Sequence, residues 1–126
     1  RTIIEEMYQI KPPFNVNGAA LAAGIEAIKD DQWKKKAIEH NLFWSKKIFS
    51  ILKDHKIKIN KPAANFFLMN FDGLKVNSDT AFKKLANNRL LLRKMKQYNI
   101  DNCLRLTIGD QKSNKHFIRY IRSILK

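Results

Sequence analysis

The chain has 126 residues, 44% of them hydrophobic, which is enough for one domain with a hydrophobic core and excludes wholesale disorder. No apolar stretch approaches the roughly 20 residues that a membrane-spanning helix needs. The net charge of +14 is typical of proteins that bind nucleic acid. However, 19 of the 25 basic residues are lysines, and they are spread over the polar faces of amphipathic segments. We therefore interpret the charge mainly as solvated surface.

The N-terminus and the cysteine content bear on where the protein is located. Glu5 and Glu6 interrupt what would be the apolar region of a signal peptide. The single cysteine, Cys103, excludes an intrachain disulfide framework and suggests a reducing compartment, which predicts a cytoplasmic location. Because the chain begins with Arg1 rather than Met, we expect it to be a fragment of a longer protein.

The first predicted elements are helical. A short apolar-rich segment over residues 3–10 ends at Pro12 and Pro13, and Asn17 is a suitable cap for a helix running to about residue 30. That helix is rich in alanine and contains Gly18 and Gly24, so we expect it to be a closely packed joint. A long helix over residues 31–55 follows, with an apolar stripe. The stripe consists of Trp33, Ala37, Asn41, Trp44, Ile48, Ile51 and Leu52.

The middle and the end of the chain alternate strands with helices. Residues 57–59 and 64–71 are predicted strands, separated by Pro62, and a helix is expected over residues 78–88. The apolar runs 90–93 and 103–108 are interpreted as buried strands. The last helix has Phe117, Ile121, Ile124 and Leu125 on one face. Together these elements predict an α+β fold, with helices packed on one face of a small, mainly antiparallel sheet.

Two arginines twelve positions apart, Arg93 and Arg105, lie in the two apolar runs. A guanidinium does not lose its proton, so in or beside a core strand it needs an anion or several acceptors around it. Strand alternation places Leu104, Leu106 and Ile108 on the core face, and therefore Arg105 on the other. If Arg93 converges on the same place, the pair forms a receptor for a phosphate or carboxylate. The alternative, that both arginines pair with structural carboxylates or point into solvent, is slightly favoured by spacing alone.

No other residues form a reactive set. His40, His55 and His116 are too scattered for a metal site, and we expect them to have surface or capping roles. Cys103 has no obvious base nearby in the sequence and is expected to be a small buried hydrophobe. Neither a Ser-His-Asp order nor a phosphate-binding glycine loop is present. The sequence therefore predicts binding groups without catalytic machinery.

Several segments together resemble the C-terminal third of histidinol-phosphate aminotransferases, which are fold-type I enzymes that use pyridoxal phosphate. They are residues 12–17 (Pro-Pro-Phe-Asn-Val-Asn), 64–66 (Ala-Asn-Phe), 92–95 (Leu-Arg-Lys-Met), Tyr98 and 103–109 (Cys-Leu-Arg-Leu-Thr-Ile-Gly). The match covers essentially the whole chain, and the two arginine motifs are its most specific part. Residues 110–114 depart from it, because they lack the threonine and acidic residues that are usual there.

The resemblance implies a homodimeric enzyme with a large cofactor domain and a small C-terminal domain. Residues 1–30 would be the end of the large domain and the interdomain helix, and residues 31–126 the small domain. Arg105 matches the family arginine that grips the substrate carboxylate or phosphate, and Arg93 matches the second anion-binding arginine.

The implied reaction transfers an amino group from glutamate to imidazole-acetol phosphate, and it is reversible. Its products are 2-oxoglutarate and histidinol phosphate. The Schiff-base lysine and the residues that bind pyridoxal 5'-phosphate would lie upstream of Arg1, so no catalytic or cofactor-binding residue is assigned and the isolated chain is expected to be inactive. An aromatic or other amino-acid aminotransferase of the same family stays open, as does a basic nucleic-acid-binding module. We expect no nucleic-acid or membrane partner.

Overall fold

The computed structural model describes residues 2–125, which separate into two compact units, Arg1–Ala37 and Ile38–Lys126. The boundary between these units falls inside a helix, and the predicted domain boundary at residue 30 stays a prediction. None of the helices in residues 2–125 is both long enough and apolar enough to cross a membrane.

The first unit consists of helices. It contains α1 (Ile3–Ile10), α2 (Gly18–Lys29) and the beginning of α3 (Asp31–Asp54). As predicted, the side chain of Asn17 caps α2 by accepting a hydrogen bond from the Ala20 amide at 2.8 Å. The same kind of bond, from the Trp33 amide to Asp30, starts α3 at 2.9 Å.

The described residues of the first unit include none that is buried. A methyl group added at Gly18 or Gly24 would meet no atom of the described residues within 4 Å. The expectation that α2 is a packed joint stays a prediction.

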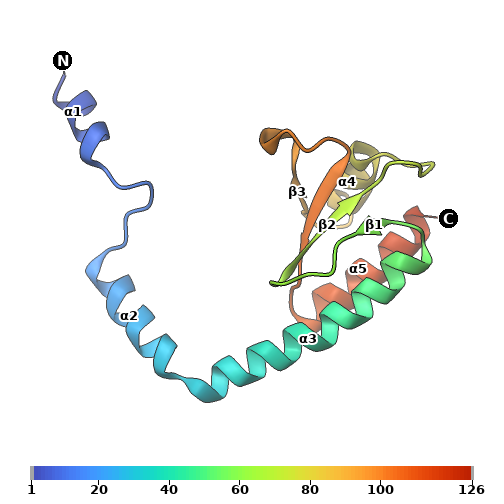
Figure 1. The fold of residues 1–126 in the computed structure, drawn as a ribbon, viewed down its shortest axis with the longest axis horizontal. Coiled ribbons are helices and arrows are strands. Elements are labelled where there is room, and N and C mark those ends of the chain that lie inside the picture. Colours follow the sequence, from blue (N-terminus) through green and yellow to red (C-terminus); the bar gives the residue numbers. More distant parts are fainter. Residues whose placement is uncertain (1, 126) are drawn as a thin grey trace. The chain divides into compact units, whose positions relative to one another are not determined.

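The second unit contains a four-stranded sheet (Figure 1). The strands are β1 (Lys58–Ile59), β2 (Phe66–Asn70), β3 (Arg93–Lys94) and β4 (Cys103–Thr107), in the spatial order β1-β2-β4-β3. All three pairings are antiparallel, as the sequence predicts. The register places Leu68 opposite Arg105, and Met69 opposite Leu104.

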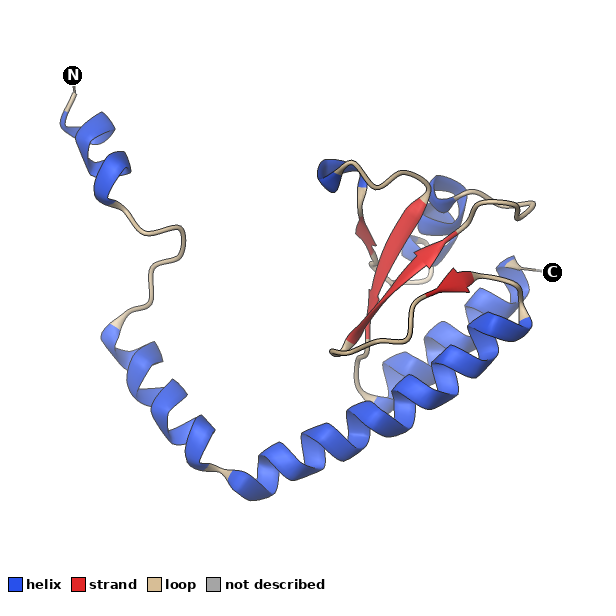
Figure 2. Ribbon diagram, viewed as in Figure 1, coloured by secondary structure: helices blue, strands red, loops and turns tan. Residues whose placement is uncertain are grey.

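Helices line one face of this sheet and build the core with it (Figure 2). These are the second half of α3, α4 (Ser78–Ala86) and α5 (Gln111–Ile124). Their buried side chains meet the inward side chains of the strands in one cluster, whose most deeply buried members are Phe67, Phe71, Phe117, Ile48, Leu52, Met69, Leu85, Leu104 and Ile121. The predicted fold class is confirmed.

The apolar stripe of α3 is buried only in its C-terminal half. Trp44, Ile48, Ile51 and Leu52 are core residues, whereas Trp33 is 65% exposed. Helical spacing correctly identifies a face, but burial requires a partner surface, and the described residues supply one only to the second half.

The prediction of a strand over residues 90–93 is wrong for its first three residues. Arg89 has a positive φ of 59°, and the Leu90 amide bonds back to the Leu85 carbonyl at 3.0 Å, which closes the end of α4. Leu92 then enters the core while Leu91 is 80% exposed. Only Arg93 and Lys94 pair with β4, so Arg93 begins its strand rather than ending it.

The junction between β4 and α5 is tightly fixed. The buried Asn114 accepts from the Gly109 amide at 3.0 Å and donates to the Gly109 carbonyl at 2.8 Å. A Cβ at Gly109 would lie 3.2 Å from the Ser113 Cβ, so the close approach favours glycine. Asp110 caps α5 by accepting from the Ser113 amide at 2.6 Å, and this hydrogen bond lowers the pKa of Asp110.

Candidate functional site: a pair of arginines on the open sheet face

The sheet has a second face, which the helices of the second unit do not cover. Strand alternation sends Phe67, Leu104 and Leu106 into the core, so their strand neighbours point the other way. We call this side the open face. Through the register it carries Lys58, Phe66, Leu68, Asn70, Arg93, Cys103, Arg105 and Thr107.

Arg93 and Arg105 lie directly opposite each other on the open face, on adjacent strands β3 and β4. Opposed residues of an antiparallel pair have Cα atoms only about 4.5–5.5 Å apart. The sequence could not decide whether the two side chains converge, and the register brings them together.

The Arg105 guanidinium is held by an aromatic ring and lacks a polar partner. Its central carbon lies 5.1 Å from the centroid of the Phe66 ring, from the neighbouring strand β2. Its Nε is buried without a hydrogen-bond partner among the described residues. Buried donors are nearly always satisfied in folded proteins, so this nitrogen calls for an acceptor that the chain does not itself supply.

Arg93 is anchored differently, by the short 3-10 helix η1 (Lys96–Tyr98) that follows its strand. Its guanidinium lies over the Tyr98 ring, 5.1 Å from the centroid, and its Nη2 donates to the Tyr98 hydroxyl. The Gln97 amide, turned with its oxygen toward the arginine, accepts from Nη2 at 2.8 Å and from Nε at 3.3 Å. Two of the three guanidinium nitrogens are therefore engaged.

Lys94, the next residue, lies on the opposite side of the sheet. Its Nζ contacts Asp79 of α4 at 2.6 Å and lies 4.8 Å from the centroid of the Phe82 ring. The hydrogen bond from Lys94 is the main reason why the pKa of Asp79 is lowered. Adjacent cations of β3 thus have separate surroundings: Lys94 is paired with an acid, and Arg93 faces another arginine.

The alternative interpretation had two parts, and the first, pairing with structural carboxylates, does not describe this arrangement. For the second, exposure to solvent, Arg93 is exposed and Arg105 is half-buried. The ion pairs among residues 2–125 join Lys29 with Glu26, Lys34 with Asp31, and Lys94 with Asp79. Like charges directly opposite each other destabilise a sheet. Two permanently positive groups at such a position therefore favour an anion between or above them, where planar guanidinium groups match carboxylate and phosphate oxygens.

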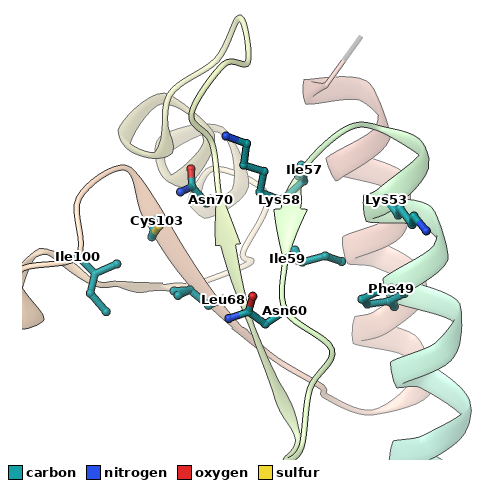
Figure 3. Close-up of a pocket in the computed structure, with 10 residues that line it drawn as sticks. All are labelled: Phe49, Lys53, Ile57, Lys58, Ile59, Asn60, Leu68, Asn70, Ile100 and Cys103. Carbon is teal, nitrogen blue, oxygen red and sulfur yellow. The ribbon is translucent and has the colours of Figure 1, made fainter.

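A pocket of about 500 Å³ lies among side chains of β1, β2, β4 and α3 (Figure 3). Both arginines are absent from its lining, which comprises Phe49, Lys53, Ile57, Lys58, Ile59, Asn60, Leu68, Asn70, Ile100 and Cys103. Burial raises the pKa of the Cys103 thiol, so the sulfur is held in its neutral form and acts as the small buried hydrophobe that the sequence predicts.

The histidines of the second unit include two that bond to backbone. His40 Nε2 lies 2.9 Å from the Gly109 carbonyl oxygen, and His116 Nε2 lies 3.0 Å from that of Asn88. The described part of the chain contains no group of three or more histidine, cysteine or acidic residues that would hold a metal ion. His40 and His116 therefore each link α3 or α5 to a backbone carbonyl of another segment of the second unit.

Most of the chain matches a known family. The model of aminotransferase class I and II matches residues 1–121. The chain belongs to this family. Its members are in general dependent on pyridoxal phosphate.

Individual relatives give a narrower likeness. The chain is 42% identical over 125 residues to a histidinol-phosphate aminotransferase of Pelagibacter ubique, covering 98% of this chain and 35% of that protein. It is 35% identical over 124 residues to one of Campylobacter jejuni, covering 98% of this chain and 33% of the relative. The sequence therefore spans about a third of the length of these curated relatives.

Solved structures share the fold. A histidinol-phosphate aminotransferase from Clostridium acetobutylicum superposes with a TM-score of 0.77 at 21% identity, over 96% of this chain and 37% of the other. A decarboxylase from Sulfurospirillum multivorans gives a TM-score of 0.68 at 17% identity, over 98% and 36%. Because different reactions occur on this fold, the fold does not by itself determine the chemistry of the chain.

The open face does not fit the cofactor alone. Pyridoxal phosphate requires an amine for its aldehyde, a carboxylate for its pyridine nitrogen and donors for its phosphate. In the part of the chain that the structure describes, the arginine pair offers donors, but no carboxylate pairs with it. The pair therefore offers donors to an anion and does not form a cofactor site by itself.

Sequence reasoning missed three neighbours of the arginines, although two of them occur in the quoted motifs. Alternation along β2 places Phe66 on the face of Arg105, and this could have been predicted. The positions of Gln97 and Tyr98 have no recognisable signal in the sequence, because three residues of 3-10 helix leave no periodic pattern.

Proposed function

We propose that the chain is the C-terminal part of a histidinol-phosphate aminotransferase, in which Arg105 and Arg93 bind the anionic groups of the substrates. The observation that carries this proposal is the cross-strand pair of arginines on the open face, with no acidic partner in the described chain. The likeness to the relatives of Pelagibacter and Campylobacter supports this choice of substrate.

The two arginines suit a site that must accept two kinds of substrate in turn. Glutamate and 2-oxoglutarate are dicarboxylates, and histidinol phosphate carries a phosphate monoester. A guanidinium recognises both kinds of oxygen with the same parallel donors. Arg105, with its buried free Nε, is proposed as the main anion-binding group, and Arg93 as the second.

The remaining parts of the enzyme are proposed to lie outside this sequence. Pyridoxal 5'-phosphate, held by upstream residues, supplies the amino-transfer chemistry, and this chain orients the substrate toward it. We propose a cytoplasmic homodimer acting on small molecules. The exposed apolar side chains of the first unit, such as Ile4, Met7 and Ile28, are consistent with surfaces that the complete protein covers.

A substrate comparison tests the proposal. In a complete enzyme with this sequence as its C-terminal part, kcat/KM is measured with histidinol phosphate and with phenylalanine, for the parent and for Arg105→Ala. Lys58→Ala is the matched control, since it removes a cation from the same open face two strands away. A clear preference for phenylalanine supports an aromatic aminotransferase, and equal activity of parent and Arg105→Ala refutes the site.

A further inference from the structure

A second group of cations surrounds a concavity on the helical layer of the second unit. The concavity has a volume of about 540 Å³ and is lined by Arg89, Lys112, Ser113, Lys115, His116 and Arg119. Ligand sites typically have volumes of about 300–1,000 Å³. The lining contains no acidic residue, and neither arginine of the open face belongs to it.

The cations are arranged against the electrostatic preference of their helix. Lys112, Lys115 and Arg119 follow one another at helical spacings of three and four, where like charges repel. Lys112 also lies in the first turn of α5, where the positive end of the helix dipole favours acids over cations. Residues Gln111 to Ile124 include no acid. The helix cap Asp110 interacts with Lys112, but it does not line the concavity.

A separate element brings Arg89 to the same concavity. Arg89 follows the end of α4 in a left-handed conformation with φ of 59°, at the position where glycine is the usual residue. His116 ties this turn to α5, since its Nε2 lies 3.0 Å from the Asn88 carbonyl oxygen. The fourth cation is therefore held against the helix by the fold and is not a neighbour by sequence.

We propose that this concavity binds a small molecule that carries two or more linked phosphate groups. Arginine forks, lysine ammonium groups and a serine hydroxyl all donate to phosphate oxygens. One phosphate monoester carries a charge of about −1.5 to −2, which leaves the four cations incompletely neutralised, whereas a linked phosphate chain matches them. A compact ligand is favoured over nucleic acid because these cations gather in one concavity, while the other lysines are dispersed along the chain.

The test uses the complete enzyme that contains this sequence, with inorganic tripolyphosphate as the probe and binding measured by calorimetry at about 0.15 M salt, where distant charges are screened. We expect tripolyphosphate to bind at least about tenfold more tightly than orthophosphate, because it reaches more of the cations. Arg89→Gln and Arg119→Gln should each weaken binding by about tenfold, through loss of a charged hydrogen bond.

Arg122→Gln is the matched control, because it makes the same change on the same helix at an exposed residue outside the lining. It should weaken binding by less than about threefold, a screened charge effect. Circular dichroism and thermal unfolding check that all variants fold, and Arg89→Lys, which keeps the charge, should bind better than Arg89→Gln.

Three results would overturn the proposal. The first is no measurable binding of tripolyphosphate, and the second is an equal loss of tripolyphosphate affinity in Arg119→Gln and Arg122→Gln. The third is tighter binding of a single-stranded oligonucleotide than of tripolyphosphate, with oligonucleotide affinity lowered by substitutions of Arg122 and Lys46 as well. The last result would instead indicate a diffuse nucleic-acid surface. None of these measurements depends on transamination, so this proposal can fail while the proposed enzyme function stands.

Discussion

The two faces of the sheet are built from the same strands but respond to different demands. On the helix-covered face, Phe67, Met69 and Leu104 are at most 1% exposed and pack into one core. The open face carries Phe66, which is half-exposed, and the facing arginines Arg93 and Arg105. The Nε of Arg105 is buried and has no hydrogen-bond partner among the described residues. Stability is therefore concentrated on one side, and unsatisfied binding capacity on the other.

Neighbouring residues make this comparison testable, because Phe66 and Phe67 lie on opposite faces of β2, and Arg93 and Lys94 on opposite faces of β3. A substitution on the core face should affect folding, and its neighbour on the open face should affect binding.

Phe67→Ala should have the largest effect, a loss of about 3–5 kcal/mol in the free energy of unfolding, because it leaves a cavity in the core. Phe67 is 1% exposed, whereas Phe66 is 42% exposed. Phe66→Ala should therefore lower the free energy of unfolding by less than about 1 kcal/mol. Urea unfolding of the chain measures both, and similar losses in the two variants would contradict the assignment of faces.

Arg105→Ala should lower kcat/KM of the complete enzyme by about thirty- to a thousandfold, equivalent to about 2–4 kcal/mol, because a charged donor pair is lost from a desolvated position. The free energy of unfolding should not fall, since the substitution removes a repulsion from Arg93 and an unsatisfied Nε. A large loss of stability together with activity would mean that Arg105 is structural.

Arg93→Ala should have a smaller effect, a decrease of about three- to thirtyfold in kcat/KM. Its Nη2 and Nε are already bonded to Tyr98 and Gln97, so fewer donors are free for a substrate than at Arg105. The comparison is made with histidinol phosphate at several concentrations. A larger loss for Arg93→Ala than for Arg105→Ala would reverse the proposed ranking.

Tyr98→Phe isolates the hydrogen bond from the stacking, because the aromatic ring over which Arg93 lies is kept. Loss of one acceptor should raise KM by about two- to tenfold with little change in kcat, since the guanidinium is less well oriented. Tyr98→Leu should have a larger effect, because it removes the ring as well. An unchanged KM in both variants would show that Arg93 is not positioned by η1.

The sequence predicts most of the fold because its signals are local. Asn17 caps its helix as predicted, and the alternation from Cys103 to Ile108 correctly divides the core face from the open face. The strand prediction is wrong for residues 90–92, because the same apolar run is expected for a paired strand and for a segment that packs into the core after a helix ends. The contact of Arg93 with Arg105 depends on register between strands, which no local pattern encodes.

Lys94→Ala should have the smallest effect on activity, less than about twofold in kcat/KM, because its ammonium group lies on the helix side of the sheet and pairs with exposed Asp79. The substitution should instead change the pKa of Asp79. Lys94 holds the pKa of Asp79 below its ordinary value of 3.8, so the pair stabilises the fold above that pH and ceases to do so as the pH falls through the lowered pKa.

In Lys94→Ala the pKa of Asp79 should therefore rise toward 3.8, as measured by NMR titration of the side-chain carboxyl. The same titration of Asp110, whose pKa is lowered by the Ser113 amide, should be unchanged and serves as the internal control. The matching experiment on Arg93→Ala should leave Asp79 unaffected and reduce activity. If Lys94→Ala instead impaired catalysis as strongly as Arg93→Ala, the two faces of β3 would not be separate, and the division between folding and binding across this sheet would be lost.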